Sequence, residues 1–380
     1  MKDLDREREM IRAVAAKTAQ KVVHPRAAEI DAAGEIPLDL IDTLGKQGFL
    51  ALVLPEAYGG THGDILTFCM VVEEIAKVSG SASLLILAQG IGVLPVMMAG
   101  SPSQQEQFFT RIAEENRLAA FTLGEPGFEC HPSRIKTRAE KQGEDYLING
   151  QKSFIVNGSM ADIYTVFAVT HPSGGAKGIS AFVVEKGTPG LRFGKNEDRL
   201  GMRGVATTDV LFENCRIPAQ NRLGEEGEGW EIARKAMNVA RVACGAQAVG
   251  ISQGAFDVAI PYSQERTQFG KAIASFQGVR FMVSDMATQI EAARALVYKA
   301  IHRLVTQSDD GEELSAAAKV FASNTAMKVT TDAVQLLGGY GYMKDYPVER
   351  MMRDAKVTQI YEGANQVQQQ VVARHLLKEE

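Results

Sequence analysis

The sequence predicts an α+β protein in which a helical region, a β-rich region and a second helical region follow one another along 380 residues. Two changes of pattern indicate this order. Apolar residues recur at helical spacing up to about residue 115, and short β-branched and aromatic runs with turn residues follow from about 118 to 225. Helical patterns return after the glycine-rich segment 224–229. We expect three domains: 1–117, 118–225 and 226–380.

The first region is predicted to be helical throughout. Leu38, Ile41 and Leu44 share one helix face, and Gly48 is a typical stop signal. Residues 81–100 form the most apolar segment, but it is interrupted by Gln89 and by glycine and proline residues. We predict a buried helix there, and no integral membrane segment. The charged N-terminus lacks the basic-then-apolar order of a signal peptide, so we expect a cytoplasmic, bacterial-type location.

The second and third regions have equally distinct patterns. Asn149–Gly150 separates two β-rich runs, 145–148 and 151–155, which predicts a hairpin with a type I′ turn. Further strands are expected at 178–184 and 208–212. Apolar residues from Val279 to Val297 form a stripe over several helical turns, which indicates a bundle core or a subunit interface.

Composition excludes several classes of function. Lys and Arg number 41 against 46 Asp and Glu, giving a net charge of −5 with no long basic run, so we expect no nucleic-acid partner. The four cysteines are far apart, and no HExxH motif or close histidine pair is present, so no metal site is expected. Walker, Rossmann and GxSxG motifs are also absent, which argues against nucleotide hydrolysis, nicotinamide chemistry and a serine nucleophile.

Seven unusual strings occur in order along the chain. They are Pro55-Glu-Ala-Tyr-Gly-Gly60, Glu125-Pro126-Gly127, Asn149-Gly-Gln-Lys152, Gly201-Met-Arg203, Glu265-Arg-Thr-Gln-Phe-Gly270, Gln335-Leu-Leu-Gly-Gly-Tyr-Gly-Tyr342 and Arg353-Asp-Ala-Lys-Val-Thr-Gln-Ile-Tyr-Glu-Gly363. Together they resemble the acyl-CoA dehydrogenase family of flavoproteins. The resemblance runs from about residue 20 to the C-terminus.

The resemblance implies an N-terminal helical domain, a central β-barrel and a C-terminal four-helix bundle, assembled as a homotetramer built from two dimers. FAD would lie between barrel and bundle, with part of its site on a neighbouring subunit. Family members remove the α-proton of an acyl-CoA thioester while a β-hydride reduces flavin N5, and electron-transfer flavoprotein accepts the electrons. This reaction needs a carboxylate beside the α-carbon and donors at the thioester carbonyl.

Glu362 is the predicted base, because it occupies the glutamate of the family's Tyr-Glu-Gly string. Another branch of the family places its base on the bundle helix just before an arginine. That position is Ala240, before Arg241, and alanine accepts no proton. The resemblance implies a raised pKa for Glu362 once an acyl chain desolvates it.

The resemblance also implies ligand contacts. FAD contacts within the chain fall on Leu123, Gly124, Phe154, Ile155 and Val156. Arg266 and Phe269 would contact the FAD of a neighbouring subunit. The other implied FAD contacts are Gln277, Gln335, Gly339 and Gln366. Arginine suits a diphosphate because it forms paired hydrogen bonds. Acyl-CoA contacts fall on Cys130, Asn238, Arg241, Tyr361 and Gly363.

Several of these positions depart from the family pattern. Gly124, Val156 and Ala364 stand where relatives have threonine or serine, Cys130 replaces a serine, and Phe154 replaces a tryptophan. Backbone N–H groups could carry the flavin contacts unchanged, or the lost hydroxyls could mark a different redox potential or acyl group.

Three functions stay open at this point. The first is an FAD-dependent acyl-CoA dehydrogenase that makes a 2,3-enoyl thioester. The second is a relative with another reaction: an acyl-CoA lyase or decarboxylating enzyme, an enoyl-CoA reductase, or a dehydrogenase of acyl groups on a carrier protein. The third is a flavin-free binding or assembly subunit.

Overall fold

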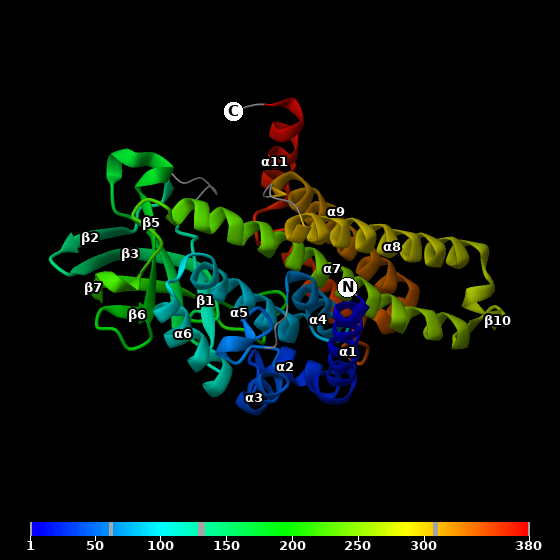
Figure 1. Ribbon diagram of the computed structural model, residues 1–380. Helices are drawn as coiled ribbons and strands as arrows, with labels where there is room; N and C mark the ends of the chain where they lie inside the picture. Colours follow the sequence, from blue (N-terminus) through cyan, green and yellow to red (C-terminus); the bar gives the residue numbers. More distant parts are fainter. Residues whose placement is uncertain (1, 61–63, 128–133, 307–310, 379–380) are drawn as a thin grey trace.

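The computed structural model describes residues 2–60, 64–127, 134–306 and 311–378 (Figure 1). Helices surround one end of a β-sheet region, and three long helices extend from it to the opposite end of the molecule. The order of helical, β and helical domains predicted from the sequence is confirmed.

Among the described residues, the N-terminal part has six α-helices. They are α1 (Lys2–Thr18), α2 (Ala27–Ala33), α3 (Leu38–Lys46), α4 (Ile65–Ala76), α5 (Gly80–Ala99) and α6 (Pro102–Glu115). Helix α5 is the predicted buried helix; it is long and apolar enough to cross a membrane, but 83% of that stretch is buried inside the protein. The helix continues through Pro95 rather than ending there. It therefore serves as a core helix.

The middle part is an eight-stranded sheet. Its strands are β1 (Ala119–Thr122), β2 (Arg138–Gln142), β3 (Asp145–Val156), β4 (Ile163–Val169), β5 (Ile179–Glu185), β6 (Leu191–Phe193), β7 (Thr207–Pro218) and β8 (Arg222–Leu223). The strand order is β6-β7-β3-β2-β4-β5-β8, and β1 pairs in parallel with β4. Strands β4 and β5, which are consecutive in the sequence, pair antiparallel along their full length.

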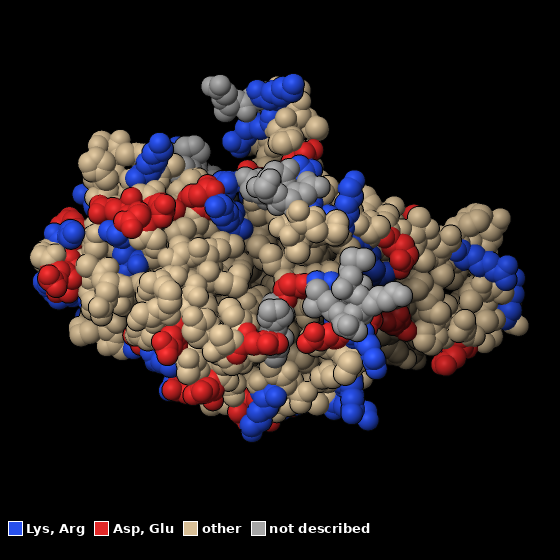
Figure 2. Space-filling view, in the orientation of Figure 1, with Lys and Arg blue, Asp and Glu red and all other residues tan. Residues whose placement is uncertain are grey.

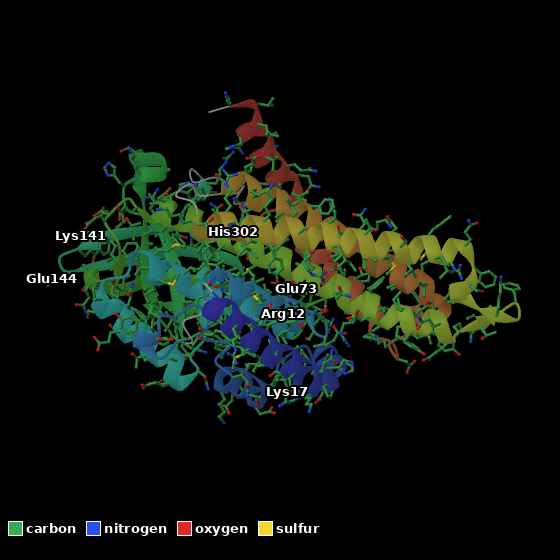
Figure 3. The ribbon with its side chains drawn as sticks, turned by 45° about the vertical axis from the view of Figure 1, so that its right-hand side comes forward. Arg12, Lys17, Glu73, Lys141, Glu144 and His302 are labelled. Carbon is green, nitrogen blue, oxygen red and sulfur yellow. The ribbon has the colours of Figure 1, made fainter. Side chains whose placement is uncertain are left out.

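The predicted hairpin turn at Asn149–Gly150 is wrong. Strand β3 runs straight through these residues, and its pairing with β7 shifts register between Ile148 and Gly150, which is a bulge. A Cβ at Gly150 would lie 2.4 Å from the hydroxyl of Thr137, so glycine is needed for close packing. The actual turn joins β2 to β3, and Lys141 and Glu144 lie at its outer tip (Figure 3).

In the described residues after 228, the C-terminal part has five α-helices and a small hairpin. They are α7 (Gly229–Glu265), β9 (Thr267–Gln268), β10 (Lys271–Ala272), α8 (Gln277–Thr306), α9 (Glu312–Leu337), α10 (Val348–Thr358) and α11 (Asn365–Leu377). Helices α7, α8 and α9 pack against one another, and α10 and α11 pack on α9. The free end of α11 projects away from the body of the molecule (Figure 1).

Ion pairs tie the N-terminal helices to the bundle. Arg12 of α1 pairs with Glu74 of α4 at 2.8 Å. The neighbouring Glu73 accepts hydrogen bonds from Arg294 at 3.0 Å and from Tyr298 at 2.8 Å on α8. One continuous apolar core also runs through all three parts. On the face in Figure 2, acidic and basic side chains are interspersed. The three parts are therefore held in fixed positions relative to one another.

Candidate active site

A cavity of about 870 Å³ lies where the three parts of the chain meet. Its walls come from α5, the end of β1, the end of β3, the loop 199–202 and the connection from α10 to α11. The α5 wall is apolar and consists of Leu84, Leu87, Ala88 and Ile91. Such a mostly apolar cavity with few polar groups is typical of a small-molecule site.

Glu362 lines this cavity from the α10–α11 connection. Burial raises the pKa of Glu362 from 4.5 to about 7, against the opposing positive charges of Lys319 and Arg241. The other carboxyl group among the described lining residues is that of Glu125, whose partner is Lys152. Glu362 is therefore the lining carboxylate that is suited to accept a proton near neutral pH.

Three residues of the lining, Phe154, Met202 and Glu362, have backbone conformations that residues other than glycine rarely adopt, and the φ angle of Met202 is 47°. The φ angle is 53° at Glu362 and 56° at Phe154, and Phe154 leaves 75% of its surface exposed. Such conformations cost about 1–3 kcal/mol each and gather at functional sites. The surrounding contacts therefore hold the carboxylate and the aromatic ring in set positions at the cavity.

The segment 123–125 and the end of strand β3 form another part of the cavity wall. The N–H of Ser153 donates to the carbonyl of Gly124 at 2.9 Å. The buried ammonium of Lys152 donates to Glu125 at 2.7 Å and to the carbonyl of Leu123 at 3.2 Å. Burial lowers the pKa of Lys152 to about 8. Glu125 and Lys152, both in motifs of the sequence, thus fasten the two segments together.

These residues fit a flavin. Leu123, Gly124, Phe154, Ile155 and Val156 all line the cavity, so an exposed aromatic ring and two stretches of backbone face the same space. Thr207 also lines the cavity, and its hydroxyl is buried with no hydrogen-bond partner among the described residues. A bound molecule with a flat apolar body would pack on the Phe154 ring, and its polar edges would meet the backbone groups of the two segments.

A second cavity of about 530 Å³ lies at the far end of the long helices, between the end of α7, the β9–β10 hairpin and the segment 336–343. Arg266 and Gly339 line it, and the guanidinium of Arg266 stacks 5.6 Å from the ring centre of Tyr340. Phe269 is 92% exposed at the tip of the hairpin, with a φ angle of 52°. This end carries part of the predicted FAD set but lies outside the first cavity.

The remaining predicted residues lie in several places. Gln277 begins α8, Gln335 lies in the last turn of α9, and Gln366 is exposed in the first turn of α11; none of the three lines either cavity. Arg241 and Asn238 are buried on α7 and joined by a 2.7 Å hydrogen bond. Cys130 lies outside the described residues.

Tyr361 and Gly363 line the first cavity beside Glu362. The hydroxyl of Tyr361 donates to Gln247, whose amide donates to Ser83 at 2.7 Å. The carbonyl of Gly363 accepts from Lys319 at 2.7 Å. Lys319 is a residue that the sequence reasoning missed, as are Gln247 and Thr207.

Comparison with known proteins agrees with this geometry. Family models of the acyl-CoA dehydrogenase N-terminal, middle and C-terminal domains match residues 5–116, 120–215 and 227–377. The chain belongs to the acyl-CoA dehydrogenase family. The predicted family and its fold are thereby confirmed.

Individual relatives match along nearly the whole chain. Cyclohex-1-ene-1-carbonyl-CoA dehydrogenase of Syntrophus aciditrophicus is 49% identical over 378 residues, 99% of this chain and 91% of the relative. The structure of butyryl-CoA dehydrogenase from Megasphaera elsdenii is similar with a TM-score of 0.94 and 41% identity, covering 98% of both chains. A chain from a structure described as the electron transferring flavoprotein of Acidaminococcus fermentans has a TM-score of 0.94 and 45% identity, again over 98% of both chains. The protein is an acyl-CoA dehydrogenase of a family that uses FAD.

Proposed function

We propose that Glu362 is the catalytic base and that the product is a 2,3-enoyl-CoA. The observation that carries this proposal is the Glu362 carboxyl group in an apolar cavity, with a pKa raised to about 7. As a carboxylate it takes the α-proton of the thioester, and the C–H electron pair becomes the new double bond as hydride leaves the β-carbon. FAD, when bound, supplies the hydride acceptor.

We infer that this chain binds FAD with its flavin along Leu123, Gly124, Phe154, Ile155 and Val156. The exposed ring of Phe154 supports this placement, because it offers a flat surface to a ring system. The lost side-chain hydroxyls at Gly124 and Val156 leave the backbone groups of the same segments as hydrogen-bond partners.

We further propose that the chain forms a homotetramer, a dimer of dimers, in which the second cavity of one subunit completes the FAD site of another. Arg266, Phe269, Gln277, Gln335, Gly339 and Gln366 would then contact FAD. The exposure of Phe269, Phe281 and Tyr342, at 92%, 66% and 83%, supports an interface there, since large apolar side chains are rarely left in water together.

The substrate proposed is an apolar acyl group on CoA, with alicyclic acyl groups included. The apolar α5 wall supports this choice, as does the name of the 49% identical relative. Arg241, Asn238, Tyr361, Gly363 and Cys130 would contact the acyl-CoA. Electron-transfer flavoprotein is the proposed electron acceptor, and the cytoplasm the proposed location; the three described cysteines are free and buried, which suits a reducing compartment.

The test is anaerobic mixing of the purified, FAD-loaded protein with a panel of acyl-CoAs. The panel contains cyclohex-1-ene-1-carbonyl-CoA, cyclohexane-1-carbonyl-CoA, butyryl-CoA and glutaryl-CoA, and the visible flavin absorption is followed. We expect bleaching by at least one alicyclic or short-chain member, and a rate about 10²–10⁴-fold lower in Glu362→Gln. Bleaching at an unchanged rate in Glu362→Gln would refute the assignment of the base. A product without a new double bond would favour a lyase, and a flavin that stays oxidised would favour a carrier-protein substrate.

A further inference from the structure

A completely buried lysine lies directly beneath the turn that carries Glu362. Lys319 is on α9, in a run of small apolar residues, and none of its surface is exposed. Its ammonium donates to the backbone carbonyl of Gly363 at 2.7 Å and to the side-chain oxygen of Asn365 at 2.9 Å. Burial of an ammonium group is costly, so such a residue needs compensating contacts that a core leucine would not need.

The turn above Lys319 has a backbone that must be held in place. Glu362 and Gly363 have φ angles of 53° and 85°. Asn365, which accepts a hydrogen bond from Lys319, donates to Ser323 at 2.9 Å and to Asn324 at 3.0 Å, both on α9. One face of α9 therefore forms hydrogen bonds to the turn at Gly363 and at Asn365, on either side of Ala364.

The positive charge of Lys319 also acts on the Glu362 carboxylate. Burial raises the pKa of Glu362, and Lys319 and Arg241 oppose this rise, in that order. The other titratable groups that interact with Glu362 are Cys244 of α7, whose pKa burial raises to about 12, and Tyr361, whose pKa lies well above its usual value. Both stay neutral near pH 7, so the cations on α9 and α7 set the charge balance.

We propose that Lys319 is a positioning residue for the Glu362 base. It fixes the turn so that the carboxylate faces the cavity, and its charge favours the ionised form of that carboxylate. This inference rests on the proposed function of Glu362. It concerns a side chain that does not itself line the cavity.

The experiment compares four variants as FAD-loaded protein: Lys319→Met, Lys319→Gln, Glu362→Gln and the control Lys328→Met. Lys328 is on the same helix but pairs with Asp285 and Asp332 at the surface. The assay follows flavin bleaching by butyryl-CoA and cyclohex-1-ene-1-carbonyl-CoA across pH, with flavin content and melting temperature recorded for each variant. A separate readout is the carboxyl infrared band of Glu362, assigned by its loss in Glu362→Gln, titrated without substrate.

We expect Lys319→Met to lower kcat about 10–100-fold with little change in KM, and to move the titration of Glu362 upward by about one pH unit. Lys319→Gln, which keeps a donor but not the charge, should recover part of kcat while the pH shift persists. Lys328→Met should match the unmodified protein.

Two results would overturn the inference. One is full kcat and an unmoved titration in Lys319→Met. The other is a loss of activity in both Lys319 variants that follows flavin content alone, with normal turnover per bound flavin. If Lys319→Met does not fold, the single variants Lys319→Gln and Asn365→Ala are compared instead. Both remove a contact to the turn, but only Lys319→Gln removes the charge, so only it should shift the titration of Glu362. A normal rate in Glu362→Gln would instead refute the proposed base, whatever the Lys319 variants do.

Discussion

Replacing Glu362 by glutamine should lower the rate of flavin bleaching about 10²–10⁴-fold and, above neutral pH, make the protein more stable. An acid whose pKa is raised by folding binds more protons in the folded than in the unfolded state. Its contribution to stability is therefore complete below pH 4.5 and is lost as pH rises through about 7. Glutamine has nearly the same shape and never ionises, so it avoids this loss.

The size of the effect follows from the shift. A rise from 4.5 to about 7 corresponds to about 3 kcal/mol at pH 8. For a chain of 380 residues this is about 4 °C in melting temperature. We expect the melting temperatures of Glu362→Gln and the unmodified protein to coincide at pH 5 and to separate by a few degrees at pH 8, when both are fully loaded with FAD.

The measurement is a thermal melt at pH steps from 5 to 8, followed by circular dichroism. Glu140→Gln, at an exposed position on β2, is the control and should show no such divergence. A difference in melting temperature that is the same at every pH, or a less stable Glu362→Gln at pH 8, would show that burial does not strain the carboxylate, and the reasoning on the base would fail with it.

Two further predictions concern the frame around the base. Gly363→Ala should lower kcat at least about 10-fold and reduce the melting temperature. The φ angle of 85° and a Cβ at 2.0 Å from the Gln368 amide leave no room for a methyl group. Steady-state kinetics and a thermal melt check this prediction, and an unchanged kcat would contradict it. Lys152→Met should destabilise the protein by about 3–5 kcal/mol, because Glu125 would keep a buried, unpaired charge. Denaturant unfolding measures this loss, and the double variant with Glu125→Leu should recover most of it; a double variant no more stable than Lys152→Met would argue against the ion-pair explanation.

Much of the fold could be predicted from the sequence, since α8 shows a regular apolar stripe and α5 is a long apolar segment. The prediction of a hairpin turn at Asn149–Gly150 was wrong for a local reason. The dipeptide favours positive φ angles, which serve a bulge as well as a turn, and only the pairing of β3 with β7 decides between them.

The candidate site divides in the same way. Glu362 belongs to one of the seven strings, Leu123 and Phe154 each lie two residues from another, and the structure places all three around one cavity. Lys319 gave no signal, because a lysine among alanines reads as an exposed helix position until the packing shows which face is buried. Thr207 was missed because its role depends on a hydroxyl without a partner, which no sequence pattern reports.

The burial of α5 has a consequence for how the protein is made. The helix is covered in part by α7, which ends at Glu265, whereas α5 itself ends at Ala99. At about 5–20 residues per second, a ribosome leaves this apolar segment without its final cover for roughly 10 to 30 s. During that interval the nascent chain presents the same feature that targeting factors and chaperones bind. Correct folding of this protein therefore depends on whether a chaperone or a targeting factor binds α5 before α7 has been synthesised.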